Sequence, residues 1–171
     1  MYSPRTETVQ IVDEDNIEIA AVSRWIMRAQ KLIHRASYIL VFNRTGELFV
    51  QKRTMSKDVY PGYYDIAAGG VVLAGESYEE SAKRELTEEL GIEGVPLTPC
   101  FYHYFADETN KVWGKVFRCR HEGPFTLQKE EIESGGFMNI SQVLDAADSK
   151  LFTPDGIEIL RRLYLEDQGH P

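Results

Sequence analysis

The chain has 171 residues, of which 43% are hydrophobic and 27% charged, and its formal net charge is -8 at pH 7. This length fits one domain with a sizeable core, and the composition is that of an ordinary soluble protein. The acidic balance argues against a nucleic-acid partner, because phosphate backbones are bound by clustered Lys and Arg. No apolar run reaches about 18 residues and no signal-like start is present, so we expect a cytoplasmic protein without a membrane span.

The N-terminal part, residues 1–34, is predicted to form a β-hairpin and a short helix. The β-prone runs 9–12 and 17–22 are separated by a polar segment, which is typical of a hairpin. Residues 23–31 favour a helix. The apolar side chains that we expect this helix to pack inward are Trp25, Ile26 and Met27.

Residues 35–171 are expected to form the core of the same single domain. The clearest strands are 38–43 and 48–52, and the apolar run of the first is typical of a central strand buried on both faces. Further strands are predicted at 64–68, 101–106 and 112–120, and helices at 141–147 and from Thr153-Pro154 to about residue 165, with Ile157, Leu160, Leu163 and Tyr164 on the buried face of the last. These elements predict an α/β fold with a mixed sheet between helices.

Two basic residues, Arg53 and Lys57, lie on the loop that follows the strand 48–52. Basic residues on loops are often solvated surface only. Because an acidic segment follows closely in the chain, these two are our first candidates for contacts with a substrate phosphate. Gly69 and Gly70 then permit a backbone conformation that turns a carbonyl oxygen toward that segment.

The acidic segment has the signals of a helix with defined ends. Ser77 is a good N-cap, and Glu80 three residues later completes a capping box. Gly91 is suited to end the helix in the left-handed conformation. At about 100° per residue, Glu85, Glu88 and Glu89 share one face. Like charges at these spacings destabilise a helix, so this face favours a bound hard cation such as Mg²⁺.

An acidic helix face alone is usually solvated surface. Here, however, residues 70–92 match the pattern Gly-x5-Glu-x7-Arg-Glu-aliphatic-x-Glu-Glu-x-Gly-aliphatic at every specified position. The segment resembles the signature box of the Nudix hydrolases, whose fold is an α/β/α sandwich. Members of this family cleave a nucleoside diphosphate linked to another moiety, by attack of water on phosphorus.

The resemblance implies roles for individual residues. Glu88 and Glu89 should ligate Mg²⁺ or Mn²⁺ together with the Gly69 carbonyl, and Glu85 should ligate a second metal or orient water. Glu76 and Arg84 should pair and support the site.

The segment 128–137 resembles the late acidic loop and strand of Nudix domains, where a glutamate adds a metal ligand or acts as the base. Glu131 is the first candidate and Glu133 the second, with a solvated acidic turn as an equally good interpretation. The catalytic candidates are therefore Arg84, Glu85, Glu88 and Glu131.

The segment 52–62, with the hairpin and His34-Arg35-Ala36, is similar to the isopentenyl-diphosphate isomerase branch of this superfamily. That branch has a catalytic cysteine before the box glycine and a histidine after it, whereas this chain has Gly69 and Val71. We therefore expect a hydrolase acting on a small nucleotide or other diphosphate, most simply a nucleoside di- or triphosphate. The alternatives are a nucleotide-binding module without turnover and, less favoured, the isomerase. Homodimers are common among similar domains, but no residue here decides the point.

Overall fold

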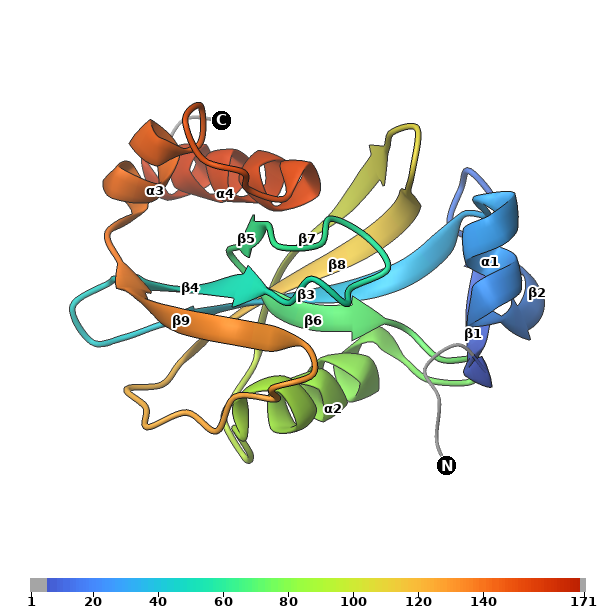
Figure 1. Cartoon of the computed structure of the whole chain (residues 1–171), viewed down its shortest axis with the longest axis horizontal. Coiled ribbons are helices and arrows are strands. Elements are labelled where there is room, and N and C mark those ends of the chain that lie inside the picture. Colours follow the sequence, from blue (N-terminus) through green and yellow to red (C-terminus); the bar gives the residue numbers. More distant parts are fainter. Residues whose placement is uncertain (1–5, 170–171) are drawn as a thin grey trace.

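The computed structural model describes residues 6–169 and has three layers, a β-sheet with helices on both faces (Figure 1). Helix α2 covers one face, and α3 and α4 cover the other. In chain order the elements are β1 (Thr8–Val12), β2 (Glu18–Ser23), α1 (Arg24–Gln30), β3 (His34–Phe42), β4 (Leu48–Arg53), β5 (Tyr64–Asp65), β6 (Ala68–Val71), α2 (Tyr78–Leu90), β7 (Thr98–Ala106), β8 (Lys111–Arg120), β9 (Ile132–Met138), α3 (Ile140–Ala146) and α4 (Pro154–Asp167). The predicted fold class is confirmed. No helix in the described range is both long and apolar enough to cross a bilayer.

Strand β3 organises the sheet. It pairs in parallel with β8 along its whole length, and antiparallel with β1, β6 and β4 in turn along its other edge. Strand β9 pairs with β4, and β7 with β8, which makes the sheet mixed. Ile39 belongs to the cluster on one face and Leu40 to the cluster on the other, so the predicted central strand is confirmed.

The N-terminal unit forms the predicted hairpin and helix and continues the sheet, because β1 pairs with β3 at Ile11 and His34. Met27 is buried as expected, but Trp25 is 52% exposed, so its predicted inward packing is wrong. The inward face of α1 is instead formed by positions 24, 27 and 28, which share one side at the i, i+3, i+4 spacing. Arg24 and Arg28 therefore face the rest of the molecule.

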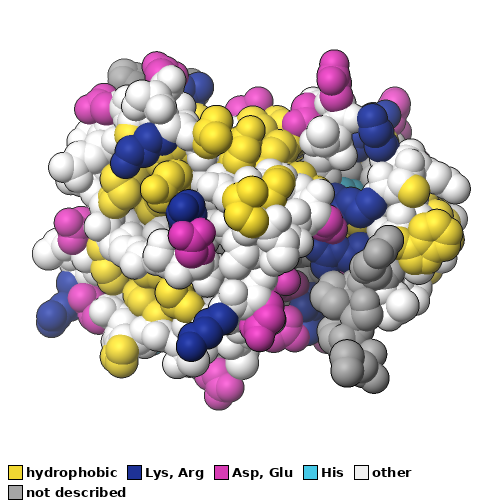
Figure 2. All heavy atoms as spheres, in the orientation of Figure 1, with side chains coloured by type: hydrophobic (Ala, Val, Ile, Leu, Met, Phe, Trp, Pro, Cys, Tyr) yellow, Lys and Arg dark blue, Asp and Glu magenta, His cyan; other side chains and the backbone are white. Residues whose placement is uncertain are grey.

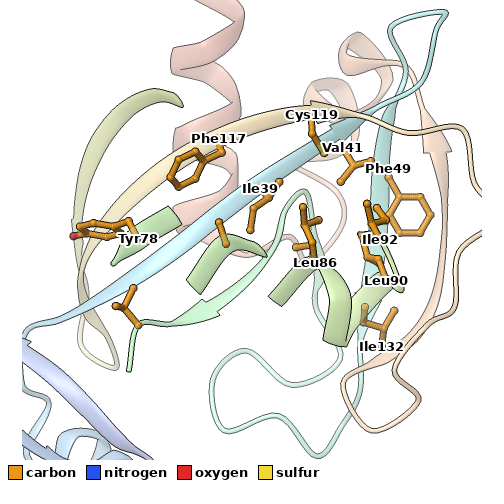
Figure 3. Packing of buried hydrophobic residues seen from close by; sticks show 13 residues of the cluster. Ile39, Val41, Phe49, Tyr78, Leu86, Leu90, Ile92, Phe117, Cys119 and Ile132 are labelled. Atoms are coloured by element: carbon orange, nitrogen blue, oxygen red, sulfur yellow. The ribbon is translucent and has the colours of Figure 1, made fainter. Parts of the chain in front are cut away.

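The core on the α2 side is built from apolar side chains of the helix and the sheet. Figure 3 shows Leu86 and Leu90 of α2 among Ile39, Val41 and Phe49 of the strands. Leu86 and Leu90 are each 1% exposed. Burying such a side chain contributes roughly 1.5–3 kcal/mol. This packing fixes the rotation of α2 and so decides where its carboxylates lie.

The predicted strand 64–68 is wrong in one respect, because the chain forms two strands there. Strand β5 pairs with β4, and β6 pairs with β3. Between them Ile66 is fully buried in the α4-side core, and the Ala67 amide donates to Asp65 Oδ1 at 3.3 Å. The break transfers the chain from one partner strand to the other, and it places β6 beside the C-terminal half of α2, where Gly69 contacts Glu89.

Helix α4 begins at Pro154 after Thr153, as predicted, but Thr153 does not cap it with its side chain. The Thr153 hydroxyl donates to Asp65 Oδ1 at 3.3 Å instead. Tyr164, predicted on the buried face, is 37% exposed, whereas Ile157, Leu160 and Leu163 are buried.

Cys100 and Cys119 are both free.

Candidate functional site

The helix that carries the carboxylates is held at both ends as predicted. The Ser77 side chain accepts from the Glu80 amide, the Glu80 carboxylate accepts from the Ser77 amide, and Gly91 ends the helix with φ of 68°. The capping box fixes the first turn, since it satisfies amides that have no partner within the helix.

The three carboxylates of the shared face differ in exposure. Glu88 has a side chain that is 50% exposed and that of Glu85 is 12% exposed, while residue Glu89 is 4% exposed. Burial and the charge of Glu85 raise the pKa of Glu89 to about 7, and burial also raises the pKa of Glu85. Two neighbouring carboxylates in a low-dielectric environment resist ionising together, and a cation relieves this.

Arg84 connects the loop before α2 to its acidic face. It contacts Glu76 through Nε at 2.8 Å, Glu85 through Nη1 at 2.8 Å and Glu88 through Nη1 at 3.3 Å. Nη2 donates to the Val71 carbonyl at 3.3 Å. Burial opposes the charge of Arg84, but the bonds to Glu76 and the charge of Glu85 outweigh it and raise the pKa of the guanidinium. The predicted Glu76 to Arg84 pair is confirmed.

Strand β6 approaches this face so closely that Gly70 has no room for a side chain. The Gly69 amide donates to Glu89 Oε2 at 3.1 Å. A Cβ on Gly70 would lie 2.5 Å from Glu85 Oε1. The contact of Gly69 with the acidic face is thus through its amide, and the metal role of its carbonyl stays a prediction.

We expect Gly69→Ala to destabilise the fold by about 3 kcal/mol or more, because backbone strain and overpacking act together. Gly69 has φ of +144°, and a Cβ there would overlap the Ser37 carbonyl oxygen on β3. Gly46→Ala is the control, since Gly46 also has positive φ, of +82°, but open space around it. That variant should lose only about 1–2 kcal/mol, the cost of an L-residue in the left-handed region. Urea unfolding of both variants measures the difference, and equal losses would contradict the close approach of β6 to β3.

Lys57 and Glu131, predicted separately from two distant loops, form an ion pair. Burial and the charge of Arg53 lower the pKa of Lys57, and the charge of Glu89 opposes them. The charge of Lys57 in turn favours the charged forms of Glu85 and Glu89 on the acidic face of α2. Glu133, the second candidate, pairs with Lys52 at 3.1 Å and is 51% exposed.

Among the described residues Arg53 contacts β5 and the loop after β4 and forms no ion pair with the carboxylates of α2. Its Nη1 donates to Asp65 at 3.0 Å and its Nη2 to the Val59 carbonyl at 2.9 Å. It lines a pocket between the N-terminal unit, the loop after β4 and the start of α4, hereafter the polar pocket. The charged or hydrogen-bonding side chains that line the polar pocket include Arg24, Arg28, Tyr38, Arg53, Lys57 and Asp155.

Figure 2 shows Lys and Arg side chains gathered where the N-terminal unit meets the rest of the molecule. Arg24 and Arg28 both donate to Asp58, at 3.3 and 3.1 Å, which ties α1 to the loop that carries Lys57. Neither these two arginines nor Asp155 is among the site residues predicted from the sequence. Their i, i+4 spacing on a predicted helix was the available signal for the arginines.

His34 lies on the wall of the polar pocket and is 2% exposed. Burial, with the charge of Arg28, lowers its pKa from 6.5 to about 3. The unfolded chain therefore binds a proton below pH 6.5 that the folded chain excludes, and stability falls as pH falls through this window.

We expect His34 to cost the fold about 2 kcal/mol between pH 6.5 and 5, at 1.36 kcal/mol per pH unit. His34→Asn keeps an N–H donor for the Leu32 carbonyl, which His34 Nδ1 contacts at 3.1 Å, but cannot be protonated. The difference between wild type and variant in urea-derived unfolding free energy, measured at pH 7 and pH 5, isolates this residue. An identical pH dependence in both proteins would contradict the neutral buried imidazole.

The acidic face fits a hard divalent cation, because Glu85, Glu88 and Glu89 supply carboxylate oxygens. The carboxylates of Glu85 and Glu89 are largely buried and repel each other, so a cation would stabilise them. Within residues 6–169, no three acidic, histidine or cysteine side chains converge closely enough to hold a metal as they stand. Arg84 holds Glu85 and Glu88 in this arrangement. Side-chain rotation away from Arg84 is therefore needed to complete a ligand set.

Comparison with known proteins agrees with this geometry. A family model described as the NUDIX domain matches residues 32–163. A Nudix hydrolase of Yersinia pestis is 50% identical over 154 residues, which are 90% of this chain and 84% of the relative. The Nudix hydrolase YfcD of Escherichia coli K12 is 46% identical over 155 residues, 91% of this chain and 85% of YfcD.

Solved structures show the same fold. DR0079 from Deinococcus radiodurans has a TM-score of 0.80 at 25% identity and covers 92% of this chain and 99% of its own. The MutT protein from Methanosarcina mazei Go1 has a TM-score of 0.68 at 22% identity, with 79% and 95% covered. With the family match over most of the chain and relatives near half identity, the chain belongs to the Nudix hydrolases, which act on pyrophosphate-containing substrates.

Proposed function

We propose that the protein is a Mg²⁺- or Mn²⁺-dependent pyrophosphohydrolase that cleaves a nucleoside diphosphate linkage by attack of water on phosphorus. Its simplest substrates are nucleoside di- and triphosphates. The observation that carries the proposal is the pair of buried carboxylates, Glu85 and Glu89, held against β6 beside the half-exposed Glu88. Binding alone does not require such a cluster, whose members destabilise one another.

The residues of the chain have distinct tasks in this proposal. Glu85, Glu88 and Glu89 would hold the cation, with the Gly69 carbonyl. A bound divalent cation supplies charge neutralisation for the phosphate oxygens and acidifies water. Glu88 contacts Arg84 and is half exposed, so it is the carboxylate best placed to turn toward a cation. Lys57, buried near Glu89, would contact a substrate phosphate.

Glu131 is the proposed additional ligand or base, and its ion pair with Lys57, whose charge acts on Glu85 and Glu89, supports the proposal. In this role the Glu131 carboxylate would accept a proton from water once the lysine turns to phosphate. We retain the proposal that the chain is an isomerase-shaped hydrolase, since Gly69 and Val71 stand where that branch needs a thiol and an imidazole.

A panel of nucleoside di- and triphosphates, incubated with Mg²⁺ or Mn²⁺ and assayed for released phosphate and pyrophosphate, tests the proposal. We expect metal-dependent turnover of at least one of them. Binding without turnover, with either metal, would favour the nucleotide-binding module. Conversion of isopentenyl diphosphate to its isomer, assayed in parallel, would favour the isomerase.

A further inference from the structure

The loop after β4 is tied to two different parts of the fold at adjacent residues. Lys57 pairs with Glu131 in the turn before β9. Asp58 accepts from Arg24 Nε at 3.3 Å and from Arg28 Nε at 3.1 Å, and both arginines lie on α1. The backbone of these two loop residues is therefore held by contacts to the core and to the N-terminal unit.

Both arginines have further partners that fix them in place. Arg24 Nη1 donates to Glu7 at 3.1 Å, and Arg28 Nη1 donates to Asn110, directly before β8, at 3.0 Å. The side chains of the two arginines are 18% and 21% exposed. Met27, which shares the inward face of α1 with them, is 1% exposed. The guanidinium groups are thus presented by a packed helix and not by flexible surface side chains.

Asp58 is a charged residue in this setting. Burial opposes its charge, but the charges of Arg28 and Arg24 outweigh burial and hold the pKa of Asp58 well below its ordinary value. A single surface ion pair contributes little to a structure, whereas charges that form a network hold more firmly. Asp58 belongs to such a network, because one carboxylate accepts from two largely buried arginines.

Binding of a phosphate changes the support of this loop. When Lys57 turns from Glu131 to a substrate phosphate, the loop loses the ion pair that holds it to the turn before β9. Asp58 is the adjacent residue, so its bridge to α1 still fixes the backbone from which Lys57 extends. Other contacts of residues 58–60 include the bond from Arg53 to the Val59 carbonyl and the bond from Tyr60 to Asp107.

The unit that supplies the bridge lies outside the matched family domain. The NUDIX model begins at residue 32, whereas β1, β2 and α1 span residues 8–30. The same unit supports the segment that leads from β6 to α2. The Gln10 amide donates to the Val72 carbonyl at 3.2 Å, and the Ala74 amide donates to the Thr8 carbonyl at 2.9 Å. The N-terminal unit therefore contacts two segments that supply residues of the candidate site.

We propose that Asp58 is a positioning residue, which holds Lys57 for a substrate phosphate by anchoring its loop to Arg24 and Arg28. The inference rests on the proposed function, because it takes from it the contact of Lys57 with phosphate. It gives the N-terminal unit a task in substrate binding. Helix α1 performs this task through Asp58, without a contact of its own to the phosphate.

Calorimetric titration of the full chain with methylenediphosphonate in MgCl₂ tests the proposal without turnover, because water does not cleave the P–C–P linkage of this ligand. Asp58→Asn keeps the size of the side chain and removes its charge. We expect this change to weaken binding about 5- to 10-fold in the wild-type background, but less than about 2-fold in the Lys57→Gln background. Such a difference between the two backgrounds indicates that Asp58 acts through Lys57.

Two further variants separate positioning from a general structural effect. Glu18→Gln is the matched control, since Glu18 also lies in the N-terminal unit and pairs with an arginine, Arg35, at 2.6 Å, away from the loop after β4; it should bind methylenediphosphonate like wild type. Asp58→Glu keeps the charge and should recover most of the affinity that Asp58→Asn loses. Thermal unfolding verifies the fold of each variant, and Mg²⁺ titrated alone should bind Asp58→Asn as it binds wild type.

Three results would overturn the inference. One is wild-type affinity for methylenediphosphonate in Asp58→Asn, and the second is wild-type affinity in Lys57→Gln. The third is an equal loss from Asp58→Asn in both backgrounds, which indicates an effect that bypasses Lys57, such as direct contact of the arginines with phosphate. Absence of binding by the wild type would contradict the proposed function and this inference together. Binding that depends on Asp58 and Lys57, without hydrolysis of any nucleotide, would contradict the proposed function alone.

Discussion

Glu88→Gln is expected to lower kcat about 10²- to 10⁴-fold, the range for losing a metal ligand or an acid-base group. The substitution keeps the shape of the side chain and removes its charge. Stability should change little, because the side chain is 50% exposed and its contact with Arg84 is a 3.3 Å pair between residues four apart, which contributes under about 1 kcal/mol. Steady-state kinetics with saturating Mg²⁺ and a thermal melt measure the two effects.

Glu79→Gln is the matched control for this substitution. Glu79 lies on the same helix, its side chain is 49% exposed, and it pairs with a single basic partner, Lys115, at 2.6 Å. It points away from the acidic face, so kcat should stay within about 2-fold of wild type. Full Mg²⁺-dependent turnover in Glu88→Gln, or an equal loss in Glu79→Gln, would contradict the role assigned to Glu88.

Arg84→Ala is expected to damage both the fold and the activity. The guanidinium compensates Glu76 and Glu85, whose side chains are 14% and 12% exposed, and the substitution leaves both carboxylates without a cation. Breaking a largely buried pair in this way costs about 3 kcal/mol or more. Loss of the anchor on the loop also displaces Glu85 and Glu88, so kcat should fall as well.

Arg84→Lys distinguishes charge from geometry. A lysine keeps the positive charge but not the fork that reaches Glu76, Glu85 and Val71 together. We expect Arg84→Lys to recover much of the melting temperature and little of kcat. An Arg84→Ala protein that melts like wild type would show that the loop is held by other contacts, and would contradict the stabilising role assigned to Arg84.

The sequence predicted the parts of the site that depend on local spacing. The capping box of α2 and its glycine end follow from residues within one loop and helix, where spacing defines geometry. The pairing of Glu76 with Arg84 was expected from the resemblance to the Nudix box. The buried central strand was also predicted, because a continuous apolar run requires cover on both faces. These features position the acidic face of α2.

Long-range packing decided what the sequence did not reveal. Trp25 was expected inside because it is apolar, but the hairpin turns α1 so that Arg24 and Arg28 face the loop after β4. The break between β5 and β6 depends on two different partner strands, which periodicity does not specify. Asp155 has an ordinary place in the first turn of a helix, and only the fold brings it to Tyr38 and near Arg53.

Titration calorimetry with MgCl₂ and with MnCl₂, on wild type and on Glu88→Gln, with and without inorganic pyrophosphate, measures whether the acidic face of α2 binds a divalent cation. We expect saturable uptake of metal by wild type, tightened by pyrophosphate and weakened at least 10-fold in Glu88→Gln, with Glu79→Gln unchanged. Absence of metal uptake under every one of these conditions, or uptake that Glu88→Gln leaves unaltered, would contradict the metal-binding role of these carboxylates.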